Sequence, residues 1–170
     1  MGLLGGIRFD SLQDLYLNQL QDLYDAEKRI LAALPKMADA AASSDLRQAF
    51  TEHQRQTQEH ITRLEQIFRQ MGREPKRETC EGIKGILDEG DELINAEGDN
   101  MVRDAALIAA AQRVEHYEIA AYGTVRSLAQ RLNQPEAVSL LQQTLNEEGD
   151  TDKMLTRIAE SHVNREARAA

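Results

Sequence analysis

The chain has 170 residues and is acidic, with a formal net charge of −9, 41% hydrophobic residues and 29% charged residues. This length is enough for one domain with a buried core, and we expect residues 1–170 to form a single domain. The negative charge argues against partners such as nucleic acid or an anionic membrane, because phosphate groups would repel the protein.

The composition predicts an all-α fold. The chain has only three prolines and ten glycines, and it is rich in residues that lose little rotamer freedom in a helix. No apolar run approaches the ~18 residues that span a bilayer, and the first residues lack the charged and apolar regions of a secretory signal. The single cysteine, Cys80, allows no intrachain disulfide and suits a reducing compartment. We therefore expect a cytoplasmic location.

The hydrophobic periodicity predicts four long helices and one short one, at about residues 11–42, 45–71, 79–96, 101–132 and 136–163. Asp10 or Ser11 is suited to cap the first helix, and Pro35 is expected to kink it or disturb it locally. The ends of the chain, residues 1–9 and 164–170, are expected to form a loose lead-in and a frayed tail.

The connection between the second and fourth predicted helices is long, and it contains the short helix. Glycines at positions 82, 85 and 90 weaken that helix, which is expected to lie across one side of the domain. A connection of this length permits the helices at residues 45–71 and 101–132 to run in the same direction.

An acidic residue interrupts the apolar stripe of the first helix. Glu27 occupies the stripe position between Leu23 and Ile30, where an apolar side chain is expected. A buried carboxylate must be paired, protonated or bound to a metal, because burying it alone costs several kcal/mol, an order-of-magnitude figure. The same anomaly recurs at Glu118 and Glu148.

The two halves of the chain repeat each other. Glu27 and Glu118 are 91 residues apart, and apolar positions on both predicted hairpins match at the same offset, through the intervening loops. The domain is therefore predicted to consist of two helical hairpins joined by the long connection.

Further polar residues lie on the inner faces of these helices. The second helix carries His53, Thr57 and His60 on one face, and Glu115 lies one turn before Glu118. Carboxylates and imidazoles that converge in a bundle core suit iron, manganese or zinc. The candidate metal ligands are Glu27, His53, His60, Glu115, Glu118 and Glu148.

A plainer interpretation also fits the inner acids. They could form a hydrogen-bonded cluster neutralised by His60, Arg113 or tyrosine hydroxyls. Other polar groups have ordinary roles in either case. Tyr24 and Tyr122 are interpreted as donors behind the ligands, Asp152 and the charged runs at residues 47–55 and 147–153 as helix surface, and Cys80 as structural. His116 and Tyr117 are expected to face away from the site, towards a subunit contact.

With its inner glutamates on the first and fourth predicted helices, the chain resembles the ferritin-like superfamily. Residues 100–124, 25–28 and 144–148 are similar to the YciF/YciE group of bacterial stress-associated proteins. The resemblance covers residues 11–160 and implies a rubrerythrin-like four-helix bundle, a long crossover carrying a short fifth helix, and a homodimer. It also implies a metal ion, iron first, with manganese or zinc as alternatives.

The chain departs from the full ferritin-like pattern on two helices. That pattern has Glu-x-x-His on both, whereas this chain has Thr57-x-x-His60 and Glu148-x-x-Thr151. A single metal, or an asymmetric pair that uses Glu115 or His53, remains open. The sequence thus supports two hypotheses: a metal-binding stress protein that handles iron or reactive oxygen, or a non-catalytic dimeric helical protein that kept the fold and lost the metal chemistry.

Overall fold

The computed structural model describes residues 7–169, and among these residues every regular element is a helix. The long helices are α1 (Leu12–Ala40), α2 (Ser44–Gln70), α4 (Asn100–Arg131) and α5 (Pro135–Ile158). The shorter helix α3 (Glu81–Ile94) lies between α2 and α4, and the π-helical turn η1 (Ala159–Val163) and α6 (Asn164–Ala167) follow α5. The predicted all-α class is confirmed. The predicted lead-in at residues 1–9 falls mostly outside the described residues.

Local chemistry explains where the first two helices begin and end. The Ser11 side chain accepts a hydrogen bond from the Asp14 backbone N–H at 3.1 Å, which caps α1. Ser43 caps α2 in the same way by accepting from the Leu46 N–H. Gly72 follows α2 with a φ of 66°, a left-handed conformation that glycine adopts without steric cost.

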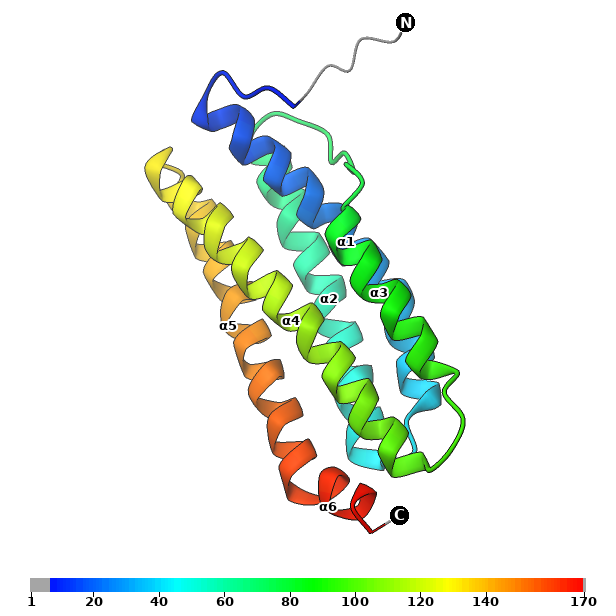
Figure 1. The fold of residues 1–170 in the computed structure, drawn as a ribbon. Helices are drawn as coiled ribbons and strands as arrows, with labels where there is room; N and C mark the ends of the chain where they lie inside the picture. Colours follow the sequence, from blue (N-terminus) through cyan, green and yellow to red (C-terminus); the bar gives the residue numbers. More distant parts are fainter. Residues whose placement is uncertain (1–6, 170) are drawn as a thin grey trace, which may run out of the picture.

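The helices form two antiparallel hairpins, α1–α2 and α4–α5, with α3 along the outside of the bundle (Figure 1). The crossover through α3 returns the chain to the end at which α2 began, so α2 and α4 run in the same direction, as predicted (Figure 1). Helix α3 packs against both α1 and α4. The chain is thus a four-helix bundle with a fifth helix covering one seam.

None of the described helices combines the length and the apolar character that a membrane crossing would require.

The inner face of α4 is not the face that apolar residues alone would indicate. Ala121 and Leu128 are only half-buried, whereas Tyr122 and Ala129 are fully buried. The reason is that α4 is covered on two sides, by the bundle and by α3, so an apolar residue on it does not by itself identify the inner face.

One expectation for the helix ends needs correction and another holds. α1 continues through Pro35 as far as Ala40, in agreement with the helix predicted at about residues 11–42. The expected frayed tail at residues 164–170 is wrong at its start, because α6 occupies Asn164–Ala167. The preceding π turn places Val163 in the core and His162 Nε2 at 3.0 Å from Ser43 Oγ, which anchors the end of the chain to the α1–α2 loop.

The core of the bundle is divided into two apolar clusters. One contains residues such as Ile30, Phe50 and Leu107, and the other contains residues such as Leu20, Leu64 and Val125. On each long helix the two clusters are separated by the inner polar residues. The bundle therefore encloses a polar layer between two apolar ones.

Candidate metal centre

The polar layer brings together all six residues that the sequence singled out as candidate ligands. They come from four helices, and each is at most 3% exposed. They are Glu27 from α1, His53 and His60 from α2, Glu115 and Glu118 from α4, and Glu148 from α5.

Helical spacing explains this convergence. His53, Thr57 and His60 follow each other at four and three residues, so they lie on one face of α2. Glu115 and Glu118, three residues apart, share a face of α4 in the same way. Each helix therefore presents its polar groups to the same level of the bundle.

The ligand atoms form two groups that share one residue. Glu27, His60 and Glu148 make the first group, and His53, Glu115, Glu118 and Glu148 make the second. Within each group the candidate ligand atoms lie within 4.8 Å of one another. The shared member, Glu148, therefore lies between two potential ion positions.

The two oxygens of Glu148 face different histidines. His60 Nδ1 lies 2.9 Å from Glu148 Oε1 and 3.3 Å from Glu27 Oε1. His53 Nε2 lies 3.8 Å from Glu148 Oε2 and 3.3 Å from Glu115 Oε1. A carboxylate that offers one oxygen to each side is arranged as a bridge between two cations.

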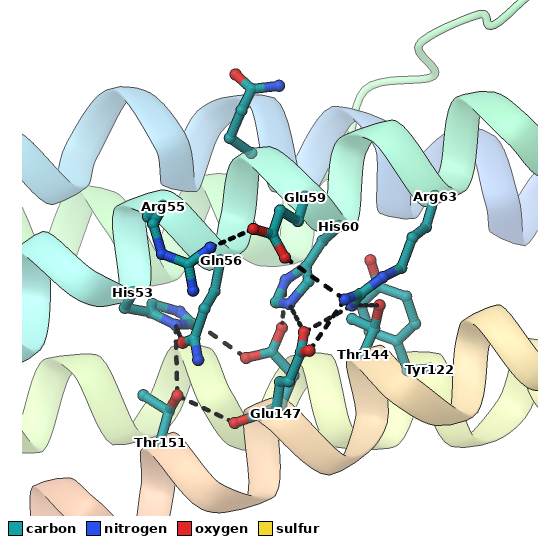
Figure 2. A network of polar contacts seen from close by, with 12 residues as sticks. His53, Arg55, Gln56, Glu59, His60, Arg63, Tyr122, Thr144, Glu147 and Thr151 are labelled. Carbon is teal, nitrogen blue, oxygen red and sulfur yellow. Dashed lines mark hydrogen bonds and ion pairs between the residues drawn. The ribbon is translucent and has the colours of Figure 1, made fainter.

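A surface carboxylate holds His60 in place. Glu147 Oε2 lies 2.8 Å from His60 Nε2, and Arg63 binds both Glu147 oxygens at 2.6 and 2.9 Å (Figure 2). The hydrogen bond with His60 and the ion pair with Arg63 lower the pKa of Glu147 to about 2. Because Nε2 donates to this carboxylate, Nδ1 is directed towards Glu27 and Glu148.

His53 is held in the opposite sense. Its Nδ1 lies 3.4 Å from Thr151 Oγ1 and 3.5 Å from Gln56 Oε1, which leaves Nε2 to face the acids (Figure 2). The Thr151 hydroxyl also donates to the Glu147 backbone carbonyl at 3.0 Å. The two residues that break the ferritin-like motif on α5 and α2, Thr151 and Thr57, are both buried beside the ligands.

The tyrosines behave differently from each other. Tyr122 is buried and donates a hydrogen bond to Glu27 Oε1, as expected for a donor behind the ligands. Tyr24 instead donates to Glu65 at 2.8 Å, so its predicted role beside Glu27 is wrong. The phase of α1 turns the Tyr24 ring towards Phe68, away from the polar layer.

Several polar atoms of the layer have no hydrogen-bond partner among the described residues. They are Glu27 Oε2, His53 Nε2, His60 Nδ1, Glu115 Oε2, and both carboxylate oxygens of Glu118 and of Glu148. Some of these atoms lie close to one another without the angles of a hydrogen bond. His60 Nδ1 and Glu148 Oε1, which are 2.9 Å apart, are an example. Groups of this kind are rare in proteins, and each costs about 1–3 kcal/mol.

Electrostatics favours protonated forms of several groups in the layer. Burial and the charge of Glu148 raise the pKa of Glu115, and burial and the charge of Glu27 raise that of Glu118. Burial alone would lower the pKa of His60, but the charge of Glu27 and the contacts with Glu147 and Glu148 outweigh it and raise that pKa to about 12. The metal-free layer therefore holds protons that a cation would displace.

Other sequence-based expectations can now be placed. His116 is exposed, and its Nε2 lies 3.3 Å from Asp152 Oδ1, which also accepts a hydrogen bond from Gln112. His116 and Asp152 therefore lie outside the layer. Arg113 is exposed and does not neutralise the acids. Tyr117 faces away from the layer, as expected, and is half-buried where it donates to Asp22 Oδ2 at 3.0 Å.

Two further features were missed by the sequence reasoning. Glu147 was assigned to a solvated charged run, and only its position next to Glu148, opposite His60, could have suggested its real contacts. The buried Asp25 binds Arg29 Nε at 2.6 Å, Arg77 Nε at 2.8 Å and the Cys80 N–H at 2.9 Å. It thereby ties the crossover to α1, two residues from Glu27.

Comparison with known proteins agrees with this architecture. The family model described as domain of unknown function DUF892 matches residues 11–168. The chain belongs to this family. It is 43% identical over 158 residues to protein YciF of Escherichia coli K12, covering 92% of this chain and 95% of that protein.

Solved structures of relatives share the fold of this DUF892 chain. The E. coli stress protein YciF superposes with a TM-score of 0.88, over 92% of this chain and 99% of that one. YcfI from Rhodopseudomonas palustris, 41% identical, gives 0.85 over 91% and 98%. A two-domain Anabaena variabilis protein with a ferritin-like domain gives 0.60 at 16% identity, over 94% of this chain and 39% of that one, which supports the ferritin-like fold alone.

Proposed function

We propose that this DUF892 protein binds two divalent metal ions in its core, with iron as the first expectation and manganese or zinc as alternatives. Glu27 and His60 would hold one ion, His53, Glu115 and Glu118 would hold the other, and Glu148 would bridge them. The observation that carries the proposal is the set of unpartnered, buried polar atoms that face one another in the layer. A cation would satisfy them, whereas the protein alone leaves them at a cost.

The donor set suits this assignment. Four carboxylates and two imidazoles are the ligands that ferritin-like di-metal proteins use, normally with Glu-x-x-His on two helices. Here Glu115 supplies the carboxylate that α2 lacks, and His53 supplies the imidazole that α5 lacks. The two residues missing from the Glu-x-x-His motifs thus correspond to ligands that other helices supply. This favours an asymmetric pair of metal ions over a single ion.

The protein side chains would prepare this site in advance. Glu147 and Arg63 fix the His60 ring, Thr151 and Gln56 fix the His53 ring, and Tyr122 restrains Glu27. Two metal ions held in this way would supply Lewis acidity and, if they were iron, electron-transfer chemistry.

We assign the protein, as part of the same proposal, to iron or oxidative-stress handling, and we expect it to act as a homodimer in the cytoplasm. The support is its relationship to E. coli YciF, which is described as a stress protein. Light scattering on the purified protein measures the dimer directly.

Metal stoichiometry tests the proposal. The protein is purified without chelator, reloaded separately with Fe²⁺, Mn²⁺ and Zn²⁺, and analysed by elemental mass spectrometry. We expect two ions per chain in the wild type and a loss of both in Glu148→Ala. The matched control is Asp150→Ala, an exposed carboxylate of α5 that pairs with Lys153. If the wild type retains no more metal than Glu148→Ala, the site is not a metal centre.

One observation favours the alternative of a non-catalytic dimeric protein. The side chains of the layer partly neutralise one another, since His60 approaches both Glu27 and Glu148, and Tyr122 binds Glu27. This alternative predicts that Glu27→Gln leaves the melting temperature unchanged and that metals do not alter it. A metal-dependent rise of several degrees in the wild type would reject it, because only a ligand of the folded state stabilises it.

A further inference from the structure

An apolar cavity reaches the polar layer. It has a volume of about 40 Å³ and is lined by residues of α1, α2, α3, α4 and α5. Its apolar walls include Ile30, Leu34, Leu87, Gly90, Ala111 and Val114, and four polar residues, His53, Asp91, Glu115 and Thr151, also line it. The cavity therefore ends at the His53 group of the layer.

Two of the polar residues that line the cavity carry buried atoms without hydrogen-bond partners among the described residues. His53 and Glu115 are 3% and 2% exposed, and His53 Nε2 and Glu115 Oε2 have no hydrogen-bond partner within residues 7–169. Neither Glu27 nor His60 lines this cavity. Instead, Tyr122 covers Glu27, and Glu147 and Arg63 cover the outer edge of His60.

The size and lining of the cavity define what it can hold. A single water needs about 10–15 Å³, so 40 Å³ accommodates a molecule of two or three heavy atoms. Water needs two to four polar partners, and away from His53, Glu115, Thr151 and the exposed Asp91 the walls offer mainly hydrocarbon. The middle of the cavity therefore suits an apolar molecule better than water.

The mouth of the cavity selects against ions. A surface groove between α1 and α3 shares Ala33, Leu87 and Asp91 with the cavity. Charges of both signs line this groove, and Lys36 Nζ lies 3.6 Å from Asp91 Oδ1. Such a mouth attracts neither anions nor cations strongly, and the apolar walls beyond it would desolvate any ion.

We propose that this cavity is a binding site for a small uncharged apolar molecule, of the size of a diatomic gas, and that it delivers this molecule to the His53 and Glu115 side of the layer. Delivery of the molecule to the layer matters only if the layer binds metal, so this part rests on the proposed function, and it would make the two metal positions unequal. The cavity itself and the class of molecule that it binds do not depend on metal.

Helix α3 provides a matched pair of variants. A Cβ at Gly90 would meet Ala110 Cβ at 3.9 Å, an ordinary contact, so Gly90→Ala is tolerated and adds a methyl to the cavity wall. Gly85 is exposed, and a Cβ there meets no described atom within 4 Å. Both substitutions remove a helical glycine, so they share the same gain in helix propensity, and only Gly90→Ala narrows the cavity.

Xenon is the probe, because it enters dry apolar cavities of this kind. The metal-free protein is titrated with xenon under pressure and followed by NMR of its methyl groups and histidine ring nitrogens. We expect saturable shifts at Ile30, Leu34, Val114 and the His53 ring, and none at His60 or in the cluster around Leu64. Gly90→Ala should weaken xenon binding at least about fivefold, the change that corresponds to 1 kcal/mol of overpacking, whereas Gly85→Ala should not.

Ala111→Val, which narrows the cavity from α4, is the second blocking variant if Gly90→Ala folds poorly. Absence of xenon binding, shifts at His60 equal to those at His53, or equal affinities in the Gly90 and Gly85 variants would each overturn the proposal. Since no metal is present, these results stand apart from the test of the metal centre. Xenon binding without metal binding would reject the proposed function and leave the cavity site in place.

Discussion

Glu118 provides the sharpest test of the idea that the polar layer is strained without metal. It is fully buried, and neither of its carboxylate oxygens has a partner among the described residues. Replacing it with methionine, which has a similar shape and no such polar atoms, removes this cost. An unsatisfied buried polar group costs about 1–3 kcal/mol, so we expect metal-free Glu118→Met to be more stable than the wild type by that amount.

The assay is thermal unfolding of chelator-treated protein, followed by circular dichroism. For a chain of this size 1 kcal/mol corresponds to about 2–4 °C, so Glu118→Met should melt roughly 2–12 °C higher. Added metal should then narrow or reverse the difference, because only the wild type keeps all ligands of the Glu118 group, and an ion at that position stabilises it by about 2.7 kcal/mol at one hundred times its Kd. Metal-free Glu118→Met that melts below the wild type would show that the carboxyl has partners, and it would refute the reasoning.

Asp25 is the control, because it is a buried carboxylate of the opposite kind. It is 2% exposed, but Arg29, Arg77 and the Cys80 N–H satisfy its oxygens. Both arginines are partly exposed and can be solvated when it is removed, which limits the loss. We expect Asp25→Leu to destabilise the protein by about 2 kcal/mol, mainly through the unpaired backbone N–H.

The same comparison has a defined pH dependence. Burial and the charge of Glu27 raise the pKa of Glu118 in the folded protein, so the folded state holds this proton more tightly than the unfolded state. The free energy of unfolding of the metal-free wild type therefore falls as the pH rises above about 4.3, the ordinary pKa of glutamate. The advantage of Glu118→Met should accordingly be larger at pH 8 than at pH 5.

Three further predictions follow from the contacts around the layer. Glu147→Gln should weaken metal binding about 10- to 100-fold in calorimetry, because it no longer orients His60, whereas Glu59→Gln on the surface should not. The metal-induced rise in melting temperature should grow from pH 6 to pH 8, because bound protons must leave the ligands, and a constant rise would argue against displacement of protons. His162→Ala should cost about 0.5–1.5 kcal/mol and speed hydrogen exchange in α6, and unchanged exchange would show that Ser43 does not anchor the chain end.

The sequence predicted the fold well because local signals and periodicity agree along most of the chain. The caps at Ser11 and Ser43 are chemical signals, and each predicted helix is present. The errors arise where tertiary packing decides. The two covered sides of α4 hid its inner face, and the π turn at Ala159–Val163 has no sequence signal that periodicity could detect.

The candidate ligands could be found because a carboxylate on an apolar stripe is conspicuous. Glu27, Glu118 and Glu148 interrupt such stripes, and His53 and His60 share a face by spacing alone. Their assembly into two groups around Glu148 could not be predicted, because it depends on the rotation of each helix. The contacts of Glu147 and Asp25 were equally hidden, since neither residue lies on an apolar stripe where its charge would be conspicuous.

The layered core explains how ligands can move between helices without loss of the fold. The two apolar clusters on either side of the polar layer fix the register of the four long helices, so any inward position within the layer reaches the same space. The composition of the layer illustrates this freedom: Glu115 brings a carboxylate from α4, and Thr57 and Thr151 occupy inward positions on α2 and α5. The surroundings of the two candidate ligand groups also differ. His53 borders an apolar cavity, whereas His60 is enclosed by Glu147 and Arg63, so the two halves of the layer differ in access even though their ligand types are similar.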